Sequence, residues 1–161
     1  MPIIGDVSKI LKLINNEIAK RRFKKFSFNN NWWNKITKWK TKNCLSFVNS
    51  NEIIKPQQAL VSLNKSIKMK DFYITTEVGQ HQMWAAQYIK FEKPKRWMTS
   101  GGLGTMGYGF PAAIGVQIAF PKSLVICVAG EASFLMNLQE LSTVKQYRLP
   151  VKIFILNNKY L

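Results

Sequence analysis

The chain has 161 residues, enough for one domain of ordinary size, and its 47% hydrophobic content argues against general disorder. No apolar run approaches the ~20 residues of a membrane-spanning helix, and the Met-Pro start lacks the apolar core of a signal peptide. We therefore expect no membrane partner. The two cysteines, Cys44 and Cys127, lack metal-ligand spacing, and Cys127 lies in an apolar run typical of an inert core thiol.

The formal net charge of +16 is concentrated in the first 70 residues, which hold 15 Lys and Arg against 3 Asp and Glu. These basic residues are interleaved with Trp32, Trp33 and Trp39, a combination that can bind nucleic acid through phosphate contacts and base stacking. The surplus coincides, however, with abundant Asn, Ile, Phe and Lys, whose codons are rich in A and T. Because compositional drift explains that pattern without a polyanion, a basic nucleic-acid-binding protein is the hypothesis that we favour least.

Residues 1–18 indicate the end of a short strand at Pro2-Ile3-Ile4, followed by an amphipathic helix that Ser8 can cap. Residues 19–52 form a basic connector, which is rich in asparagine. Within it, the segment from Asn31 to Lys42 has apolar residues at helical spacing. The spacing predicts a linker helix with one apolar face.

Residues 53–161 have the pattern of an α/β domain, which begins with a helix from Gln57 to Met69. Strands are then predicted at Phe72 to Thr76, Ser123 to Ala129 and Val151 to Leu156, and helices at Pro111 to Phe120 and Asn137 to Gln146. The nearly unbroken apolar run from Ser123 to Ala129 suits a strand buried on both faces of a mainly parallel sheet. Ligands of such sheets bind outside the carboxyl ends of the strands, and polar residues gather at two of those ends.

Glu131 and Asn158 offer the hard oxygen ligands that Mg²⁺ prefers beside substrate phosphates. Five glycines crowd the turn from Gly101 to Gly109, which lets backbone N–H groups approach a phosphate beside a helix N-terminus. These residue types indicate a magnesium-diphosphate site. The alternative is that the glycines only permit tight turns and that Asn157-Asn158 only ends a strand.

At these residues the sequence resembles the thiamine-diphosphate domain of acetolactate synthase (acetohydroxyacid synthase) large subunits. The matching segments are TTEVGQHQMWAAQ (Thr75 to Gln87), RWMTSGGLGTMGYGFPAAIG (Arg96 to Gly115) and SFLMNLQELSTVKQYRLPVKIFILNN (Ser133 to Asn158). The resemblance implies an α/β, mainly parallel, three-layer fold that is incomplete at its C-terminus. It also implies that residues 1–18 end the family's middle, FAD-type domain, that 19–52 are a linker, and that 53–161 begin the thiamine-diphosphate-binding domain.

By the same resemblance, thiamine diphosphate is bound by Gly79, Gln80, His81, Gly104, Met106, Glu131, Ala132, Ser133 and Asn158. The implied magnesium ligands are Glu131, Asn158 and the backbone carbonyl of Tyr160, and Asp6 and Val7 match positions that approach FAD. No catalytic residue is implied, because the family's catalytic glutamate belongs to an amino-terminal domain that this chain lacks. Without the resemblance, Met106 also fits a gap-filling core residue, and His81, the only histidine, fits a structural one.

The family's Gly-Asp-Gly reads Gly130-Glu131-Ala132 in this chain. The longer glutamate moves the carboxylate, and Mg²⁺ tolerates poor geometry badly. Ala132 adds a Cβ at a turn where we expect the conformational freedom of glycine to matter. Glu77 likewise replaces an aspartate that is usual in the family.

The resemblance implies a thiamine-diphosphate- and magnesium-dependent condensation of two pyruvates to 2-acetolactate with loss of CO₂, in branched-chain amino-acid biosynthesis. The second substrate can also be 2-oxobutyrate. Implied partners are further copies of the chain, a complementing large-subunit fragment or a regulatory small subunit, in the plastid stroma or the bacterial cytoplasm. Whether this chain is active alone is left open. Two alternatives stand beside this function: an inactive remnant that binds only cofactor or a partner subunit, and another thiamine-diphosphate carboligase or pyruvate oxidase.

Overall fold

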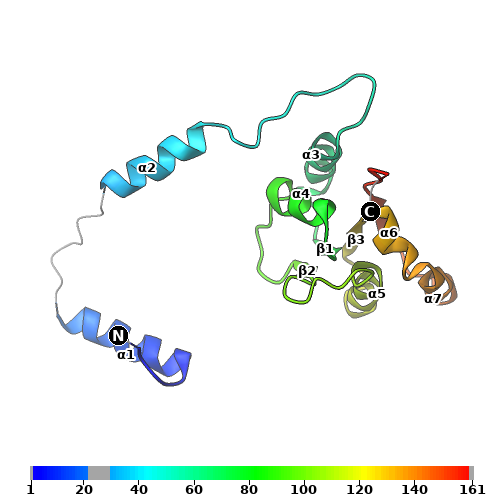
Figure 1. The fold of residues 1–161 in the computed structure, drawn as a ribbon. Coiled ribbons are helices and arrows are strands. Elements are labelled where there is room, and N and C mark those ends of the chain that lie inside the picture. The colour runs from blue at the N-terminus through cyan, green and yellow to red at the C-terminus, as the bar shows by residue number, and fades with distance from the viewer. Residues whose placement is uncertain (1, 22–29, 160–161) are drawn as a thin grey trace. The chain divides into compact units, whose positions relative to one another are not determined.

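The computed structural model describes residues 2–21 and 30–159 (Figure 1). The chain divides into two compact units, Met1–Ser46 and Phe47–Leu161. Within the described ranges, no helix is both long and apolar enough to cross a membrane.

The first unit contains α1 (Val7–Lys20) and α2 (Asn30–Thr41). Asp6 caps α1, because its Oδ1 accepts a hydrogen bond of 3.0 Å from the backbone N–H of Lys9. The prediction that Ser8 caps this helix is therefore wrong, since Ser8 lies inside its first turn. The predicted strand end at Pro2-Ile3-Ile4 is also wrong, because these residues belong to no strand and pair with no strand of the described chain.

Helix α2 confirms the helix predicted from Asn31 to Lys42 to within one residue at each end. Trp32 and Trp39 lie on one side of it, with ring centroids 5.6 Å apart in an edge-to-face arrangement. Both rings, and that of Trp33, are about half exposed.

The second unit is built on a four-stranded sheet in the order β2-β1-β3-β4, and every neighbouring pair is parallel. This confirms the α/β, mainly parallel fold expected from the sequence. The strand β2 was not predicted. The elements, in chain order, are α3 (Pro56–Ile67), β1 (Phe72–Thr76), α4 (Gln80–Tyr88), β2 (Trp97–Thr99), α5 (Gly109–Ala119), β3 (Leu124–Ala129), α6 (Glu131–Leu135), the 3₁₀ turn η1 (Leu138–Glu140), α7 (Leu141–Gln146) and β4 (Lys152–Ile155).

Helices cover both faces of the sheet, which gives the expected three layers (Figure 1). Strand β3 shows why: Ile126 and Val128 face α3 and α4, whereas Val125 and Cys127 face α5. A strand that alternates between two apolar layers must be apolar throughout, and β3 is. The largest fully buried apolar side chains on the two faces are Leu60 from α3 and Phe110 from α5.

The topology places a crevice at one edge of the sheet. From β1 the chain passes through α4 to β2, on one side, whereas from β3 it passes through α6 and α7 to β4, on the other side. Because β1 and β3 are hydrogen-bonded neighbours, their connections leave in opposite directions at their carboxyl ends. This is the topological switch point at which open α/β sheets bind ligands.

Candidate diphosphate site

A pocket of about 300 Å³ lies at this switch point, at the carboxyl ends of β1, β3 and β4. It brings together eight of the nine residues predicted to bind thiamine diphosphate. They are Gly79, Gln80, His81, Met106, Glu131, Ala132, Ser133 and Asn158. The ninth, Gly104, does not line the pocket, but its positive φ of 63° bends the loop against Val78, which does.

His81 occupies the wall between the two turns that follow β1 and β3. The ring edge with Nδ1 and Cε1 packs against Gly79 and Gly130: a Cβ added to either glycine would lie 2.9–3.3 Å from these ring atoms. Gly79 also has a φ of 137°, which side chains rarely adopt. Glycine is therefore required at 79 both by the backbone and by the ring.

Glu77 is the buried charge beneath this wall, and its burial was not predicted from the sequence. Its side chain is 1% exposed, and its Oε1 lies 3.1 Å from Nε2 of His81. The two atoms are at ion-pair distance, but they are not aligned as a hydrogen bond, and neither has another hydrogen-bond partner. Its other oxygen, Oε2, lies so close to Gly109 that a Cβ there would overlap it.

Hydroxyl groups fix the end of β1 beside this pair. Thr76 Oγ1 donates to Thr99 Oγ1 at 2.8 Å, and Thr99 Oγ1 donates to the carbonyl of Glu77 at 3.2 Å. Trp97 Nε1 donates to Thr76 Oγ1, and Gln82 Nε2 donates to Thr99 Oγ1. Strand β2, although short, therefore locks the turn from which Gly79, Gln80 and His81 project.

Glu131 is the first residue of α6, and only Gly130 separates it from the end of β3. Its carboxylate lies in the first turn of a helix, where the backbone N–H groups favour negative charge. Ala132, the next residue, is helical and does not have a positive φ. The expected need for glycine at 132 is therefore wrong, because the turn enters a helix directly at Glu131.

Asn158 approaches the same pocket from the end of β4, so the expected juxtaposition of the β3 and β4 ends is seen. Its Nδ2 donates a hydrogen bond of 3.1 Å to Gln80 Oε1, which ties the third strand end to the turn after β1. Asn157, by contrast, faces away, and its Oδ1 accepts from the backbone N–H of Lys159. Tyr160, the third predicted magnesium ligand, lies outside the described residues.

The predicted flavin contacts, Asp6 and Val7, lie in the first unit. The Asp6 carboxylate caps α1, and Val7 is exposed as the first residue of that helix. Binding of a flavin there stays a prediction.

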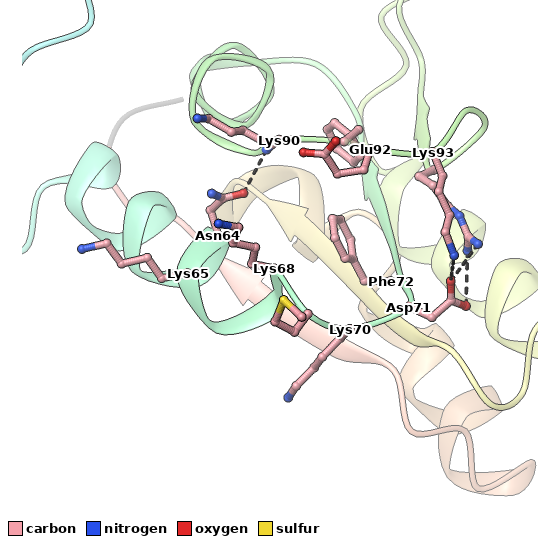
Figure 2. A pocket seen from close by; sticks show the side chains of 12 residues that line it. Asn64, Lys65, Lys68, Lys70, Asp71, Phe72, Lys90, Glu92 and Lys93 are labelled. Carbon is pink, nitrogen blue, oxygen red and sulfur yellow. Dashed lines mark hydrogen bonds and ion pairs between the residues drawn. The ribbon is translucent and has the colours of Figure 1, made fainter.

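A second, larger cavity of about 600 Å³ lies at the opposite, amino-terminal edge of the sheet (Figure 2). Its basic residues do not converge on one point: Lys65 and Lys70 extend away from the cavity, and Lys93 and Arg96 are both hydrogen-bonded to Asp71 (Figure 2). We therefore place the functional site at the smaller pocket, where the sheet topology and the polar groups coincide.

Comparison with known protein families identifies the class of protein to which the chain belongs. A family profile described as "Thiamine pyrophosphate enzyme, C-terminal TPP binding domain" matches residues 77–161, more than half of the chain. The chain belongs to this family of thiamine pyrophosphate enzymes.

Individual relatives confirm the resemblance to acetolactate synthase large subunits, and the three that follow all carry that name. The whole chain aligns with that of Buchnera aphidicola subsp. Schlechtendalia chinensis at 51% identity over 162 residues, and with isozyme 3 of Escherichia coli (strain K12) at 46% over 165 residues. With the subunit of Porphyra purpurea, 98% of the chain aligns at 47% identity over 159 residues. The chain spans 28% of the first two relatives and 26% of the third.

The pocket fits the diphosphate and cation of the cofactor that this family implies. Its charged and amide groups, Glu131, Asn158 and Gln80, are of the hard oxygen type that Mg²⁺ prefers. The described residues contain no group of three or more His, Cys, Asp or Glu that could hold a metal by themselves. Mg²⁺ usually takes one or two protein ligands and completes its shell with phosphate and water.

Proposed function

We propose that the pocket binds the magnesium-diphosphate end of thiamine diphosphate, as part of an acetolactate synthase large subunit. The proposed reaction joins two pyruvates, or pyruvate and 2-oxobutyrate, with loss of CO₂. The observation that carries the proposal is that residues from three strand ends, chosen from the sequence alone, line one pocket at the switch point of the sheet. The family match over residues 77–161 supports the same cofactor.

Each wall of the pocket has a separate task. The turn of Gly79, Gln80 and His81 presents polar groups to the phosphates, and the first turn of α6 adds its backbone N–H groups. Glu131 and the side-chain oxygen of Asn158 would hold Mg²⁺ between the phosphates and the protein. When bound, the cofactor supplies the carbanion chemistry that acts on 2-oxo acids.

Met106 lines the pocket as its flexible apolar group and is partly exposed. We assign it to the thiazolium and aminopyrimidine rings of the cofactor, which a thioether can pack against in more than one conformation. We assign no proton transfer to the described residues. This chain's part in the reaction is to bind and orient the cofactor and its cation.

We further propose that the active assembly contains more than this one chain, with further copies, a complementing large-subunit fragment or a regulatory small subunit as partners. The compartment that we propose is a plastid stroma or a bacterial cytoplasm. The names of the relatives, from bacteria and from Porphyra, support this choice.

Calorimetric titration of the purified chain with thiamine diphosphate, with and without Mg²⁺, tests the proposal. We expect binding that requires Mg²⁺ and that Glu131→Gln abolishes. Glu92→Gln is the matched control, because it removes an equal charge from the cavity at the opposite edge of the sheet. The double variant Glu131→Asp, Ala132→Gly restores the family's triplet, and we expect the shorter carboxylate at 131 to make it bind more tightly than the wild type.

Circular dichroism on the same samples separates loss of the site from loss of the fold. If a folded wild-type chain and the folded double variant both fail to bind, the proposed function is wrong for this chain. Magnesium-dependent binding that Glu131→Gln leaves unchanged would instead place the cation elsewhere.

A further inference from the structure

Glu77 has no task in the proposed function, although it faces His81 directly behind the pocket wall. Their side chains are 1% and 7% exposed, and each leaves an atom, Oε1 or Nε2, without a hydrogen-bond partner. A buried carboxylate is costly unless it is compensated. The only ion-pair partner recorded for Glu77 in the described chain is His81, and their two atoms face each other at 3.1 Å.

The surrounding structure prevents Glu77 from turning away. Gly109, the first residue of α5, closes the other side of the carboxylate. Gly109 is itself anchored, because Thr75 Oγ1 donates a buried hydrogen bond of 2.7 Å to its carbonyl. The start of an α-helix also favours a negative charge beside it. The carboxylate is thus held from behind by α5 and aimed at the imidazole.

The imidazole of His81 lies between the two turns that form the pocket. Its Nδ1 edge is packed between Gly79, in the turn after β1, and Gly130, in the turn after β3. If the ring tilted or withdrew, the spacing between those turns would change, and with it the fit of any ligand that spans them. The position of the ring is therefore a property of the site, and the Nε2 atom of the ring faces the buried carboxylate of Glu77.

We propose that Glu77 is a positioning residue for His81: its carboxylate accepts a hydrogen bond from Nε2–H and fixes the ring as a spacer between the two pocket turns. The pair is close but not aligned in the free chain, as is common for functional hydrogen bonds before a ligand binds. Ligand binding across the two turns draws the ring into line with the carboxylate. The inference rests on the proposed function only for the identity of that ligand, a magnesium-bound diphosphate.

His81 is the only histidine of the chain, so an NMR sample labelled with ¹⁵N-histidine gives one imidazole without any assignment. We expect a proton on Nε2 that exchanges slowly with water and resonates downfield, as a charge-assisted hydrogen bond requires. The signal should strengthen on addition of thiamine diphosphate and Mg²⁺. Absence of a protected Nε2 proton in both states of the wild type overturns the proposal without any variant.

Two substitutions separate the charge of Glu77 from its shape. Glu77→Gln keeps the shape and removes the charge, whereas Glu77→Asp keeps the charge and shortens the side chain. A positioning role through the carboxylate predicts that Gln moves the Nε2 proton upfield, whereas Asp retains the downfield signal. Cofactor affinity should fall on the order of 10-fold in Glu77→Gln, as when the partner behind a ligating histidine is removed, and should be closer to wild type in Glu77→Asp.

A side chain that only fills space gives the opposite ranking, with Gln like the wild type and Asp impaired, and that result overturns the proposal. The two proposals also fail separately. If thiamine diphosphate does not bind, but Glu77→Gln still changes the imidazole signal, the pair stands and the proposed function falls. If the cofactor binds normally to Glu77→Gln, the proposed function stands and the role of Glu77 falls.

Discussion

Two glycines of the same helix, Gly109 and Gly115 of α5, should respond to alanine with opposite signs. Gly115 is exposed near the middle of the helix, and a Cβ there would meet no atom within 4 Å. Alanine at this position removes backbone freedom from the unfolded chain and gains helix propensity. Gly115→Ala should therefore raise the free energy of unfolding by about 0.5–1 kcal/mol.

At Gly109 the same change meets a filled space. The new Cβ would overlap Oε2 of Glu77 and would lie 3.2 Å from the backbone carbonyl carbon of Thr76. The carboxylate cannot swing into solvent, because its side chain is buried against His81. Overpacking of this kind costs about 1–3 kcal/mol, which exceeds the gain in helix propensity. Gly109→Ala should lower the free energy of unfolding.

Urea denaturation followed by circular dichroism measures both changes, with equal m-values as the check that only stability has changed. Gly115→Ala is the control for any general effect of alanine in α5. If both variants are more stable than the wild type, Glu77 is not confined by Gly109, and the structural argument for its fixed carboxylate fails. We also expect Gly109→Ala, but not Gly115→Ala, to disturb the imidazole signal of His81.

Three further results are expected. Asp71 accepts hydrogen bonds from the Ser123 hydroxyl, at 2.6 Å, and from the Lys93 ammonium. These two hydrogen bonds, together with the charge of Arg96, lower the pKa of the Asp71 carboxyl. The stability that Asp71 contributes is thus present above the ordinary carboxyl pKa of about 4 and is lost as pH falls through the lower pKa of the folded chain. Asp71→Asn should therefore lower the free energy of unfolding, measured in urea, at pH 7 but not at the acid end. A difference between variant and wild type that does not change with pH would contradict this. Burial, with the nearby charge of Glu77, raises the pKa of the Cys127 thiol to about 12. A thiol reagent at pH 8 should therefore modify only the exposed Cys44 in the native chain and both cysteines in denaturant; rapid native modification of both would refute the burial of Cys127. Leu60→Ala should lower the free energy of unfolding by about 2–5 kcal/mol, measured in urea, because Leu60 is fully buried between α3 and the sheet. A loss below about 1 kcal/mol would show that α3 does not pack there.

The long apolar strands and the polar residues after them were predictable because both follow from local pattern. β3 is a continuous apolar run, β1 and β4 are mostly apolar or β-branched, and parallel strands place their carboxyl ends at one edge. Glu131 and Asn158 could therefore be assigned to one site before the fold was known. The short strand β2 could not be predicted, because three residues carry no periodicity and its pairing depends on β1.

The features that the sequence did not reveal depend on contacts between distant segments. Glu77 follows a strand, and the local pattern does not indicate its burial, which depends on contacts with Gly109 and His81. Ala132 was expected to strain a turn, but the chain enters α6 at the preceding residue, and helix boundaries of this kind are set by tertiary packing. At the first unit, Asp6 rather than Ser8 caps α1, although both are good capping residues and lie two positions apart.

The parallel pairing of β1 with β3 also governs when the site comes into being. β1 has no partner on that side until α4, β2 and α5 have been synthesised, because these elements separate it from β3 in the chain. Pairing over such a long loop is slow and belongs to the cooperative folding step itself. The two turns that hold His81 between them meet only in that step, so partly folded chains have no pocket.

A ligand that spans both turns therefore binds only the folded chain and not the unfolded one. At a concentration one hundred times its Kd, it adds about 2.7 kcal/mol to the free energy of unfolding. A supply of diphosphate cofactor would then act on this chain as a folding aid, lowering the fraction of molecules open to proteolysis at any moment. Cellular abundance of the chain should follow the cofactor level, independently of any turnover.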